Sequence, residues 1–294
     1  MRTAARPNTS SRLSNSTSFL RWFSNLPGAA LVALFVFVAI YPIAWIFFSS
    51  FKDASEFSHN PMWSLPSVLH VENYARAWNQ GHMGTYFFNS VVTVVPSVMI
   101  VIALGVAAAF GIEIMRWRFA SAIGLLFLAG IMVPIQIVLL PLFSMYYATH
   151  ILDTRLALVL TYVAFGLPTT VFFLASFFKT FSREIIEAAI MDGASVYQVF
   201  FRIALPMVMN AVVTVALIQF FFMWNDLLVS LTFTSSPGLR TIQAGLLSFS
   251  GQYGQREWGP TFAAVALAVT PTVLIYLFLN QLVMKGLAAG AVKG

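Results

Sequence analysis

Few side chains in this 294-residue sequence are of the types that carry out chemistry. Cysteine is absent, which excludes disulfides, thiolate metal sites and cysteine nucleophiles. The four histidines, His59, His70, His82 and His150, form no H-x-x-x-H pair of the kind that holds zinc on a helix. No Gly-Lys-Ser/Thr sequence is present to cradle a nucleotide phosphate. We therefore predict that the chain is not an enzyme and carries no cofactor or metal of its own.

The composition indicates a membrane protein. Hydrophobic residues make up 59% of the chain and charged residues only 9%, whereas a soluble domain has about 25% charged residues. So little polar surface could not cover a soluble globule of this size, and a disordered protein is excluded for the same reason. The net charge of +6 comes without a basic cluster interleaved with aromatic residues, so nucleic acid is not expected as a partner.

Six apolar stretches are long enough to span a bilayer as helices, which takes about 20 residues. They cover residues 29–50, 87–112, 119–148, 156–178, 203–225 and 258–284, and we expect the fifth to continue past Asp226 to about Phe233. The period-two pattern of a membrane barrel is missing. Small residues at four-residue spacing indicate close helix contacts; these are Ala103, Ala107 and Gly111, and Ala264 and Ala268. The predicted fold is an all-α integral membrane protein, a six-span helical bundle.

Lysine and arginine set the predicted orientation. With the N-terminus inside, the inner segments hold eleven of the 16 basic residues and the outer segments hold five. The positive-inside rule then places both termini in the cytoplasm. Residues 1–26, rich in Ser, Thr, Asn and Arg, are expected to form a disordered cytoplasmic tail. A cleaved signal peptide is the rival interpretation, although the apolar stretch that follows is longer than such a peptide requires.

One polar stretch, residues 179–206, has the pattern of folded helices on the inner side. Ser182 is placed to cap a first helix, with Glu184 in its first turn, where a carboxylate meets the positive end of the helix dipole. Gly193 after Asp192 is a typical left-handed stop. Ser195 then opens a second short helix with Gln198 three residues on, which is a capping box.

This stretch has two possible roles. A surface-bound amphipathic helix would need a basic polar face to bind anionic lipid. Here three basic residues are balanced by three acidic ones, namely Lys179, Arg183 and Arg202 against Glu184, Glu187 and Asp192. This neutrality favours contact with a protein over contact with anionic lipid, although the surface helix remains open on these grounds.

The same stretch carries a motif. Glu187-Ala188-Ala189 is followed by Gly193 and then by Ile203-Ala204-Leu205-Pro206, and this pattern resembles the EAA loop of the permeases of ABC importers. The resemblance implies that the loop is a coupling helix held in a cleft of an ATPase subunit. The residues to which it assigns that role are Glu184, Glu187, Ala188, Ala189, Asp192, Gly193, Leu205 and Pro206.

Other segments are similar to the carbohydrate permeases of that family. They are Glu72-Asn73-Tyr74, Asn89-Ser90 and Trp224-Asn225-Asp226, together with a C-terminal tail at 286–294 that resembles the tail of the maltose-transporter permease, which reaches the ATPases. The resemblance implies a type I permease domain over residues 27–285 in a bacterial cytoplasmic membrane. It also implies a second permease subunit, two ATPase subunits that hold ATP and Mg, and an extracytoplasmic solute-binding protein.

Within this family the solute would be a di- or oligosaccharide. Aromatic faces, amides and a carboxylate are the groups that a sugar site needs, and the fifth span offers them at its outer end. The candidates for the substrate path are Gln219, Phe222, Trp224, Asn225 and Asp226. Two structural alternatives stay open: the aromatic residues could pack against helices or lipid, and Asp226 could cap or pair at the outer interface.

An ion-coupled secondary transporter of a small polar solute is the alternative function. Such a protein needs ionisable groups or unwound helices inside the membrane. Asp226 is the one carboxylate within the predicted spans. The scarcity of such groups favours an energy source outside the chain.

Overall fold

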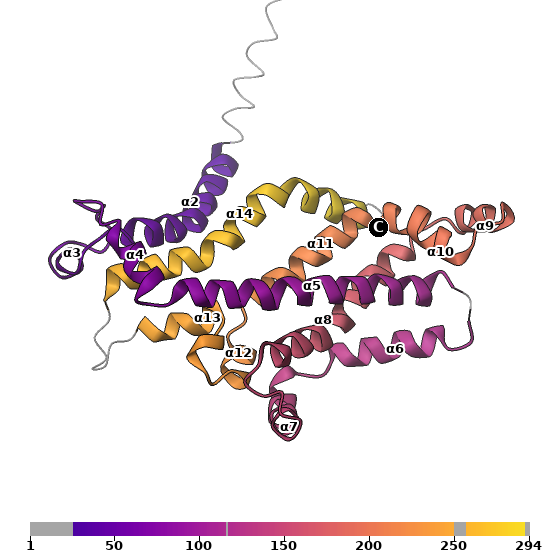
Figure 1. Ribbon diagram of the computed structural model, residues 1–294. Coiled ribbons are helices and arrows are strands. Elements are labelled where there is room, and N and C mark those ends of the chain that lie inside the picture. The colour runs from indigo at the N-terminus through magenta and orange to yellow at the C-terminus, as the bar shows by residue number, and fades with distance from the viewer. Residues whose placement is uncertain (1–25, 116, 250–256, 292–294) are drawn as a thin grey trace, which may run out of the picture.

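The computed structural model describes residues 26–115, 117–249 and 257–291, and across those ranges it is helical without strands (Figure 1). The expected cytoplasmic tail at 1–26 lies outside these ranges except for residue 26. The C-terminal segment expected at 286–294 begins inside the last helix, α14 (Trp258–Ala291), and residues 292–294 lie outside the described part.

Five helical segments are long and apolar enough to cross a bilayer. They contain α2 (Leu26–Ser49), α5 (Met83–Glu113), α8 (Arg155–Phe178), α11 (Leu205–Trp224) and α14. These segments confirm five of the six predicted spans, with ends that differ by a few residues from the sequence-based bounds.

The third predicted span, residues 119–148, is not a continuous helix. It consists of α6 (Ala120–Ile131) and α7 (Ile135–Ala148), which meet at an angle of 96°. Pro134 lies at the break with an extended backbone, at φ −66° and ψ 129°. Proline has no N–H to donate and disfavours helical geometry at the residue before it, here Val133. The third predicted span is therefore a bent pair of helices, and it is the sixth span of the described chain if the pair crosses the membrane as one unit.

The fifth span also ends earlier than predicted. Helix α11 stops at Trp224, and a separate short helix, α12 (Leu228–Phe233), follows. The Asp226 carboxylate accepts hydrogen bonds from the backbone N–H of Val229 at 3.1 Å and of Ser230 at 3.3 Å. A side chain that satisfies the free N–H groups of a helix start favours a new helix over continuation of the old one.

Helices α5 and α8 form the most extensive helix pair, and glycines let them approach closely. A Cβ on Gly105 of α5 would lie 2.4 Å from the side chain of Thr170 on α8, and one on Gly166 of α8 would lie 3.2 Å from that of Val101 on α5. Ala103 and Ala107, which we expected at such a contact, are exposed. Ala264 and Ala268 are buried as expected. Small residues do mediate the packing, but on α5 they lie on a different face.

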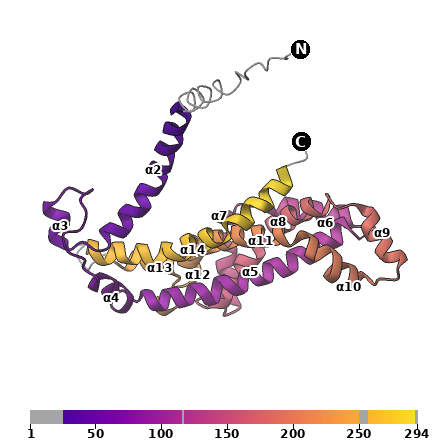
Figure 2. The same cartoon turned by 90° about the horizontal axis from the view of Figure 1, so that it is seen from above.

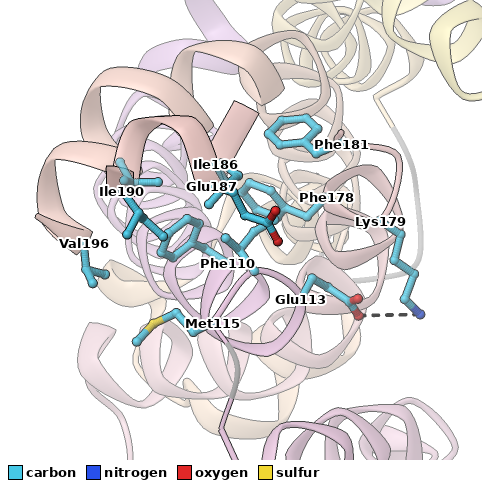
Figure 3. A pocket seen from close by; sticks show the side chains of 12 residues that line it. Phe110, Glu113, Met115, Phe178, Lys179, Phe181, Ile186, Glu187, Ile190 and Val196 are labelled. Atoms are coloured by element: carbon cyan, nitrogen blue, oxygen red, sulfur yellow. Dashed lines mark ion pairs between the residues drawn. The ribbon is translucent and has the colours of Figure 1, made fainter. Parts of the chain in front are cut away.

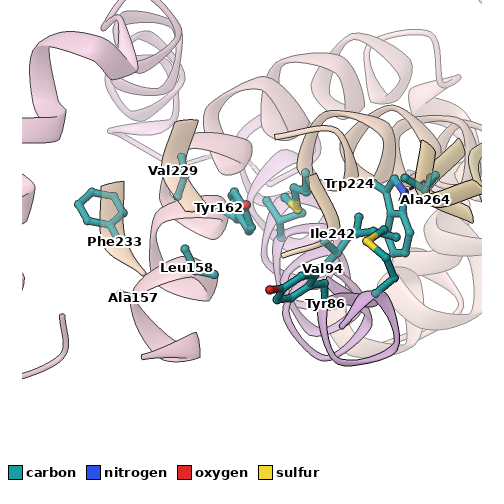
Figure 4. Close-up of a cluster of buried hydrophobic side chains, with 14 of the residues drawn as sticks. Tyr86, Val94, Ala157, Leu158, Tyr162, Trp224, Val229, Phe233, Ile242 and Ala264 are labelled. Carbon is teal, nitrogen blue, oxygen red and sulfur yellow. Dashed lines mark hydrogen bonds between the residues drawn. The ribbon is translucent and has the colours of Figure 1, made fainter. Parts of the chain in front are cut away.

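The larger core cluster joins both ends of the chain. Side chains from α5, α8, α11, α12 and α14 meet in it, together with α13 (Ile242–Gly245) of the last outer loop (Figure 4). Trp224 is at its centre: the ring stacks on Phe220 with centroids 5.4 Å apart, and its Nε1–H donates to the carbonyl of Ala268 at 3.0 Å. A second cluster lies where α5 and α8 end, beneath the polar stretch 179–206.

Helix α2 stands apart from the bundle. Its apolar side chains are exposed along most of its length, and Figure 2 shows it rising away from the other helices. It is joined to them near its C-terminal end, where the ring of Trp45 packs edge-on against Phe262 with centroids 5.1 Å apart. An all-apolar helix with this exposure needs lipid or another subunit around it.

The two longest segments between spans at this end of the bundle are folded. Between α2 and α5 lie α3 (Ala54–His59) and α4 (Glu72–Asn79), and the later loop contains η2 (Pro237–Leu239), α13 and η3 (Leu246–Phe249). Lys52 is buried at the base of the first loop, where its ammonium donates to the Met62 carbonyl at 3.3 Å and to the Ser64 hydroxyl at 3.2 Å. These bonds join two parts of the first segment to each other.

Candidate functional site

The polar stretch folds into a helical hairpin. Helix α9 (Arg183–Met191) leads through Gly193 into α10 (Val196–Gln198), and the π-helical segment η1 (Val199–Ala204) connects α10 to α11. Figure 1 shows α9 and α10 at one end of the bundle, beyond the end of α5. We call residues 183–204 the coupling hairpin.

The hydrogen bonds at the end of α9 explain the spacing of the motif. The N–H of Ala194 donates to the carbonyl of Ala189 at 2.9 Å, and that of Gly193 donates to Ile190 at 3.0 Å. This is a Schellman ending, which needs a left-handed residue at the position that Gly193 occupies with φ +80°. A glycine four residues after the second alanine is therefore what closes α9 and turns the chain towards α10.

The start of α10 has the predicted capping box. The Ser195 N–H donates to the Gln198 side chain at 2.8 Å, and the Gln198 N–H donates to the Ser195 hydroxyl at 3.4 Å. The prediction for Ser182 holds only in part, because it is the N-cap residue of α9 but its side chain makes no capping bond to the backbone. Its hydroxyl donates to the Glu184 carboxylate at 3.4 Å.

The last two motif residues lie where the hairpin enters the membrane span. Leu205 begins α11 and Pro206 follows it inside a helical run that starts at Val196, so the backbone hydrogen bond that an N–H would donate there is missing. The N–H of Leu205 donates to the carbonyl of Phe200, which is the wide turn of a π-helix. No residue pattern indicated this π-helical turn, and such turns are frequent at functional sites.

The coupling hairpin exposes apolar side chains. Ile186 is the buried side chain of α9, whereas Met191 is 86% exposed and Tyr197 is 78% exposed. Glu184, Glu187, Ala188 and Asp192 are also exposed, and Ala189 is half-buried. An exposed apolar patch with a polar rim is typical of a surface that binds another protein.

A cavity of about 420 Å³ separates α9 from the ends of α5 and α8 (Figure 3). Most of its wall is apolar, and the three charged side chains that line it are Glu113, Lys179 and Glu187. The Lys179 ammonium lies 3.5 Å from the Glu113 carboxylate. The hairpin is thus held to the bundle at Ile186 and at η1, with an open space between these contacts.

The candidates for the substrate path line neither the cavity beside α9 nor the hollow around Asn89 and Arg155. Gln219 is buried and donates to the Gly166 carbonyl at 3.1 Å and to the Thr170 hydroxyl at 2.9 Å. Trp224 is buried in the core, and Asp226 caps α12 and accepts from the Tyr162 hydroxyl at 3.0 Å. Phe222 and Asn225 are exposed. Asp226 therefore has the capping role that the sequence left open.

A second group of polar residues fixes the outer loop. Asn89 is fully buried, donates to the carbonyls of Gly238 at 2.8 Å and Arg240 at 3.0 Å, and accepts from Arg155 at 2.8 Å. The neighbouring Ser90 hydroxyl accepts from the Ile242 N–H at 2.8 Å. The pair Asn89-Ser90 resembles a segment of the carbohydrate permeases. No feature of the sequence predicted that this pair contacts a loop about 150 residues away.

Asp153 holds the same loop from the other side. Its carboxylate accepts from the backbone N–H groups of Ser235 at 2.8 Å and Ser236 at 2.9 Å. The hydrogen bond from the Ser236 hydroxyl, followed by the backbone bonds, lowers the pKa of Asp153 from its ordinary value of 3.8. We refer to Asn89, Asp153 and Arg155 with their partners in the loop 235–242 as the outer clamp.

Known proteins resemble this chain over most of its length. A probable ABC transporter permease protein of Bacillus subtilis is 34% identical over 89% of this chain and 86% of its own. The diacetylchitobiose uptake system permease protein NgcG of Streptomyces coelicolor is 34% identical over 90% of this chain and 87% of its own length.

The fold has a counterpart among crystal structures. A bacterial ABC transporter involved in the import of the acidic polysaccharide alginate contains a chain that matches with a TM-score of 0.76 at 19% identity, over 94% of this chain and 99% of the other. Residues 85–288, which include the coupling hairpin and most of the outer clamp, match the family described as binding-protein-dependent transport system inner membrane component. The chain belongs to this family and is a multi-pass inner-membrane permease of the ABC importer type.

Proposed function

We propose that this permease forms half of the path through which an ATP-driven importer moves a carbohydrate, a di- or oligosaccharide. A relative from Streptomyces coelicolor is named as a permease of a diacetylchitobiose uptake system, and this name supports a sugar as the solute. A second permease subunit would complete the path, and a solute-binding protein would deliver the sugar from outside. ATP and Mg would be held by two partner ATPase subunits, and both termini of this chain would lie in the cytoplasm.

One observation carries the proposal: the coupling hairpin is a closed structural unit with an exposed apolar surface. Its turn is fixed by Gly193 at φ +80°, and its tip presents Met191 and Tyr197. A rigid projection of this kind can transmit the movement of a bound partner, whereas a flexible loop would absorb that movement.

The connection to the membrane supports a mechanical role. The hairpin continues through η1 into α11 without a break in the helical backbone. A partner that moves α9 would therefore tilt α11, and α11 is packed against α5, α8 and α14. The bundle would change as a unit between an arrangement open to the cytoplasm and one open to the outside, because packed helices shift between discrete arrangements. Partner binding would select between those arrangements through its different contacts in each.

The residues proposed for coupling have two kinds of role. Glu184, Glu187, Ala188 and Asp192 are exposed and would contact the ATPase subunit. Ala189, Gly193, Leu205 and Pro206 would keep the shape of the hairpin, because they take part in the Schellman ending or in the start of α11. On the path itself, Phe222 and Asn225 are the candidates with exposed side chains.

A charge reversal at Glu187 tests the contact. The variant Glu187→Arg should weaken the association of the ATPase subunits, measured by co-purification of the complex, because an exposed carboxylate is replaced by a cation at the proposed interface. Glu72→Arg, which reverses a charge on the outer helix α4, serves as the control and should leave co-purification unchanged. Equal recovery of the ATPase with both variants would contradict the proposed contact.

The alternative of ion-coupled transport makes a different prediction. The charged residues within the described spans, Glu113, Arg155 and Arg202, lie at or near span ends, where they are poorly placed for an ion pathway. Sugar uptake by reconstituted vesicles should therefore need ATP and should persist when an ionophore collapses the ion gradients. Uptake by the permease alone along an ion gradient would support the alternative instead.

A further inference from the structure

The cavity beneath α9 has no role in the mechanism proposed above. It is a partly open cavity lined mainly by side chains of α5, α8, α9 and α10, and at about 420 Å³ it lies within the range of about 300–1,000 Å³ that is usual for ligand sites. We propose that this cavity binds one acyl chain of a membrane phospholipid that has a primary-ammonium headgroup, and that the bound lipid supports the coupling helix α9. This inference rests on the proposed coupling role of α9.

The wall of the cavity matches a hydrocarbon chain. Phe110, Phe178, Ile186 and Val199 are buried side chains that line it, and Phe181 joins them at the edge of the same cluster. The ring centroids of Phe110 and Phe178 lie 6.0 Å apart, and those of Phe178 and Phe181 lie 5.4 Å apart. A space this large with such a wall loses dispersion contacts if it stays empty, which an apolar chain would restore.

The position of the cavity points to the membrane as the source of its occupant. Helix α5 ends at Glu113 and α8 ends at Phe178, so the cavity lies at the level where two spans leave the bilayer. Phospholipid headgroups lie at this level, and a chain can extend from there along apolar side chains. A polar metabolite that needs hydrogen bonds along its whole length would meet a wall that is mostly apolar, with charged side chains only at Glu113, Lys179 and Glu187.

The charges at the cavity match a zwitterionic headgroup. Glu113 and Glu187 supply carboxylates for an ammonium group, and Lys179 supplies a cation for the lipid phosphate. Figure 3 shows Glu113 and Lys179 paired on one side of the cavity and Glu187 on α9 across it. Aromatic rings beside an ammonium group add cation–π attraction. An anionic lipid without an ammonium group would meet two carboxylates and a single lysine.

A bound chain would stiffen the link between α9 and the bundle. Ile186 is the buried side chain by which α9 itself reaches the second core cluster. A chain in the cavity would contact Ile186 and Ile190 on one side and Phe110 and Phe178 on the other. Movement of α9 would then pass to α5 and α8 directly, as well as through η1 to α11.

The test is photolabelling of the complete transporter in lipid vesicles. The probes are phosphatidylethanolamine with a diazirine near the end of one acyl chain and the matching phosphatidylglycerol. We expect the ethanolamine probe to label the segments 110–115 and 178–199 more strongly than the glycerol probe does. Val196→Trp, which adds a large side chain at the cavity wall, should remove most of this labelling, whereas Met209→Trp on α11, away from the wall, should not.

A second variant tests the headgroup without filling the cavity. Glu113→Gln should lower the preference for the ethanolamine probe by about threefold, the size of effect expected for losing one partly exposed ion pair. Labelling without enrichment in these segments, enrichment that Val196→Trp leaves unchanged, or equal labelling by both probes would overturn the proposal. Labelling reports on the cavity and ATPase capture reports on the proposed function, so each can fail while the other stands.

Discussion

Gly193 is the residue on which the geometry of the coupling hairpin depends most. Its φ of +80° is a conformation that side chains with a Cβ rarely adopt, yet a Cβ placed there would meet nothing within 4 Å. The demand for glycine is therefore one of backbone conformation and not of space. The motif spacing was sufficient to predict this, because the Schellman ending is a local structure.

Two substitutions at Gly193 separate conformation from bulk. Gly193→Val should cost about 1–2 kcal/mol locally and should reduce ATP-driven uptake in vesicles, while the affinity of the binding protein for sugar stays unchanged. Gly193→Asn should retain most of the uptake, since asparagine tolerates the left-handed conformation. Equal loss in both variants would show that the φ angle is not the cause.

Gln219 shows where reasoning from residue types reached its limit. An amide among aromatic residues is suitable chemistry for a sugar site, but this amide donates to Gly166 and Thr170 of the neighbouring helix. The sequence could not reveal that partner, because it lies about 50 residues away on α8. The same limit applied to Trp224, whose N–H donates to Ala268 on α14.

Replacing Gln219 with leucine tests this packing role. Gln219→Leu removes two buried hydrogen bonds and leaves the Thr170 hydroxyl with its bond to the Gly166 carbonyl. A loss of about 1–3 kcal/mol in stability is expected, seen as a lower melting temperature of the purified complex. The sugar concentration for half-maximal uptake should stay unchanged, and a marked rise in it would instead place Gln219 on the substrate path.

At the level of helices, periodicity and length predicted most of the fold. The spans in α2, α5, α8, α11 and α14 followed from apolar length alone, and the capping signals of the hairpin followed from its sequence. The break at Pro134 and the early end of α11 did not follow, because prolines inside five other helices of the described chain are accommodated without such a break. Which proline breaks a helix depends on its neighbours in space.

The outer clamp should release at low pH. The pKa of Asp153 is lower in the folded chain than its ordinary value of 3.8, so its contribution to stability is present above pH 4 or so and is lost as the pH falls through the lower, folded value. Protonation removes the acceptor for the N–H groups of Ser235 and Ser236. Proteolysis of the loop 235–242 by an acid-active protease should therefore become faster as the pH falls below the ordinary carboxyl pKa of 3.8.

The control for this experiment is Asp153→Asn. Asparagine is compatible with the left-handed backbone of this residue, at φ 59°, but its amide carries no charge and does not titrate. The variant should be cleaved at a rate that changes less with pH than that of the natural chain, after correction for protease activity. The same pH dependence in both proteins would mean that another group controls the loop.

At the scale of the whole molecule, the bundle is an incomplete structure. Helix α2 is exposed along most of its length, and the coupling hairpin exposes Met191 and Tyr197 at one end of the bundle (Figure 1). Under the proposed function, the first surface contacts lipid or the second permease subunit, and the second surface contacts the ATPase subunit. Composition predicted the membrane setting, but the exposed surfaces could be located only in three dimensions.

The absence of cysteine makes the central claim directly testable. A single cysteine at Met191, the most exposed position of the hairpin, can carry a short cross-linker, and a single cysteine at Leu69 in the outer segment provides the control. We predict that Met191→Cys captures a nucleotide-hydrolysing subunit in membranes that contain the full transporter, and that Leu69→Cys does not. Failure of Met191→Cys to capture such a subunit, in membranes where ATP-driven uptake is intact, would contradict the account.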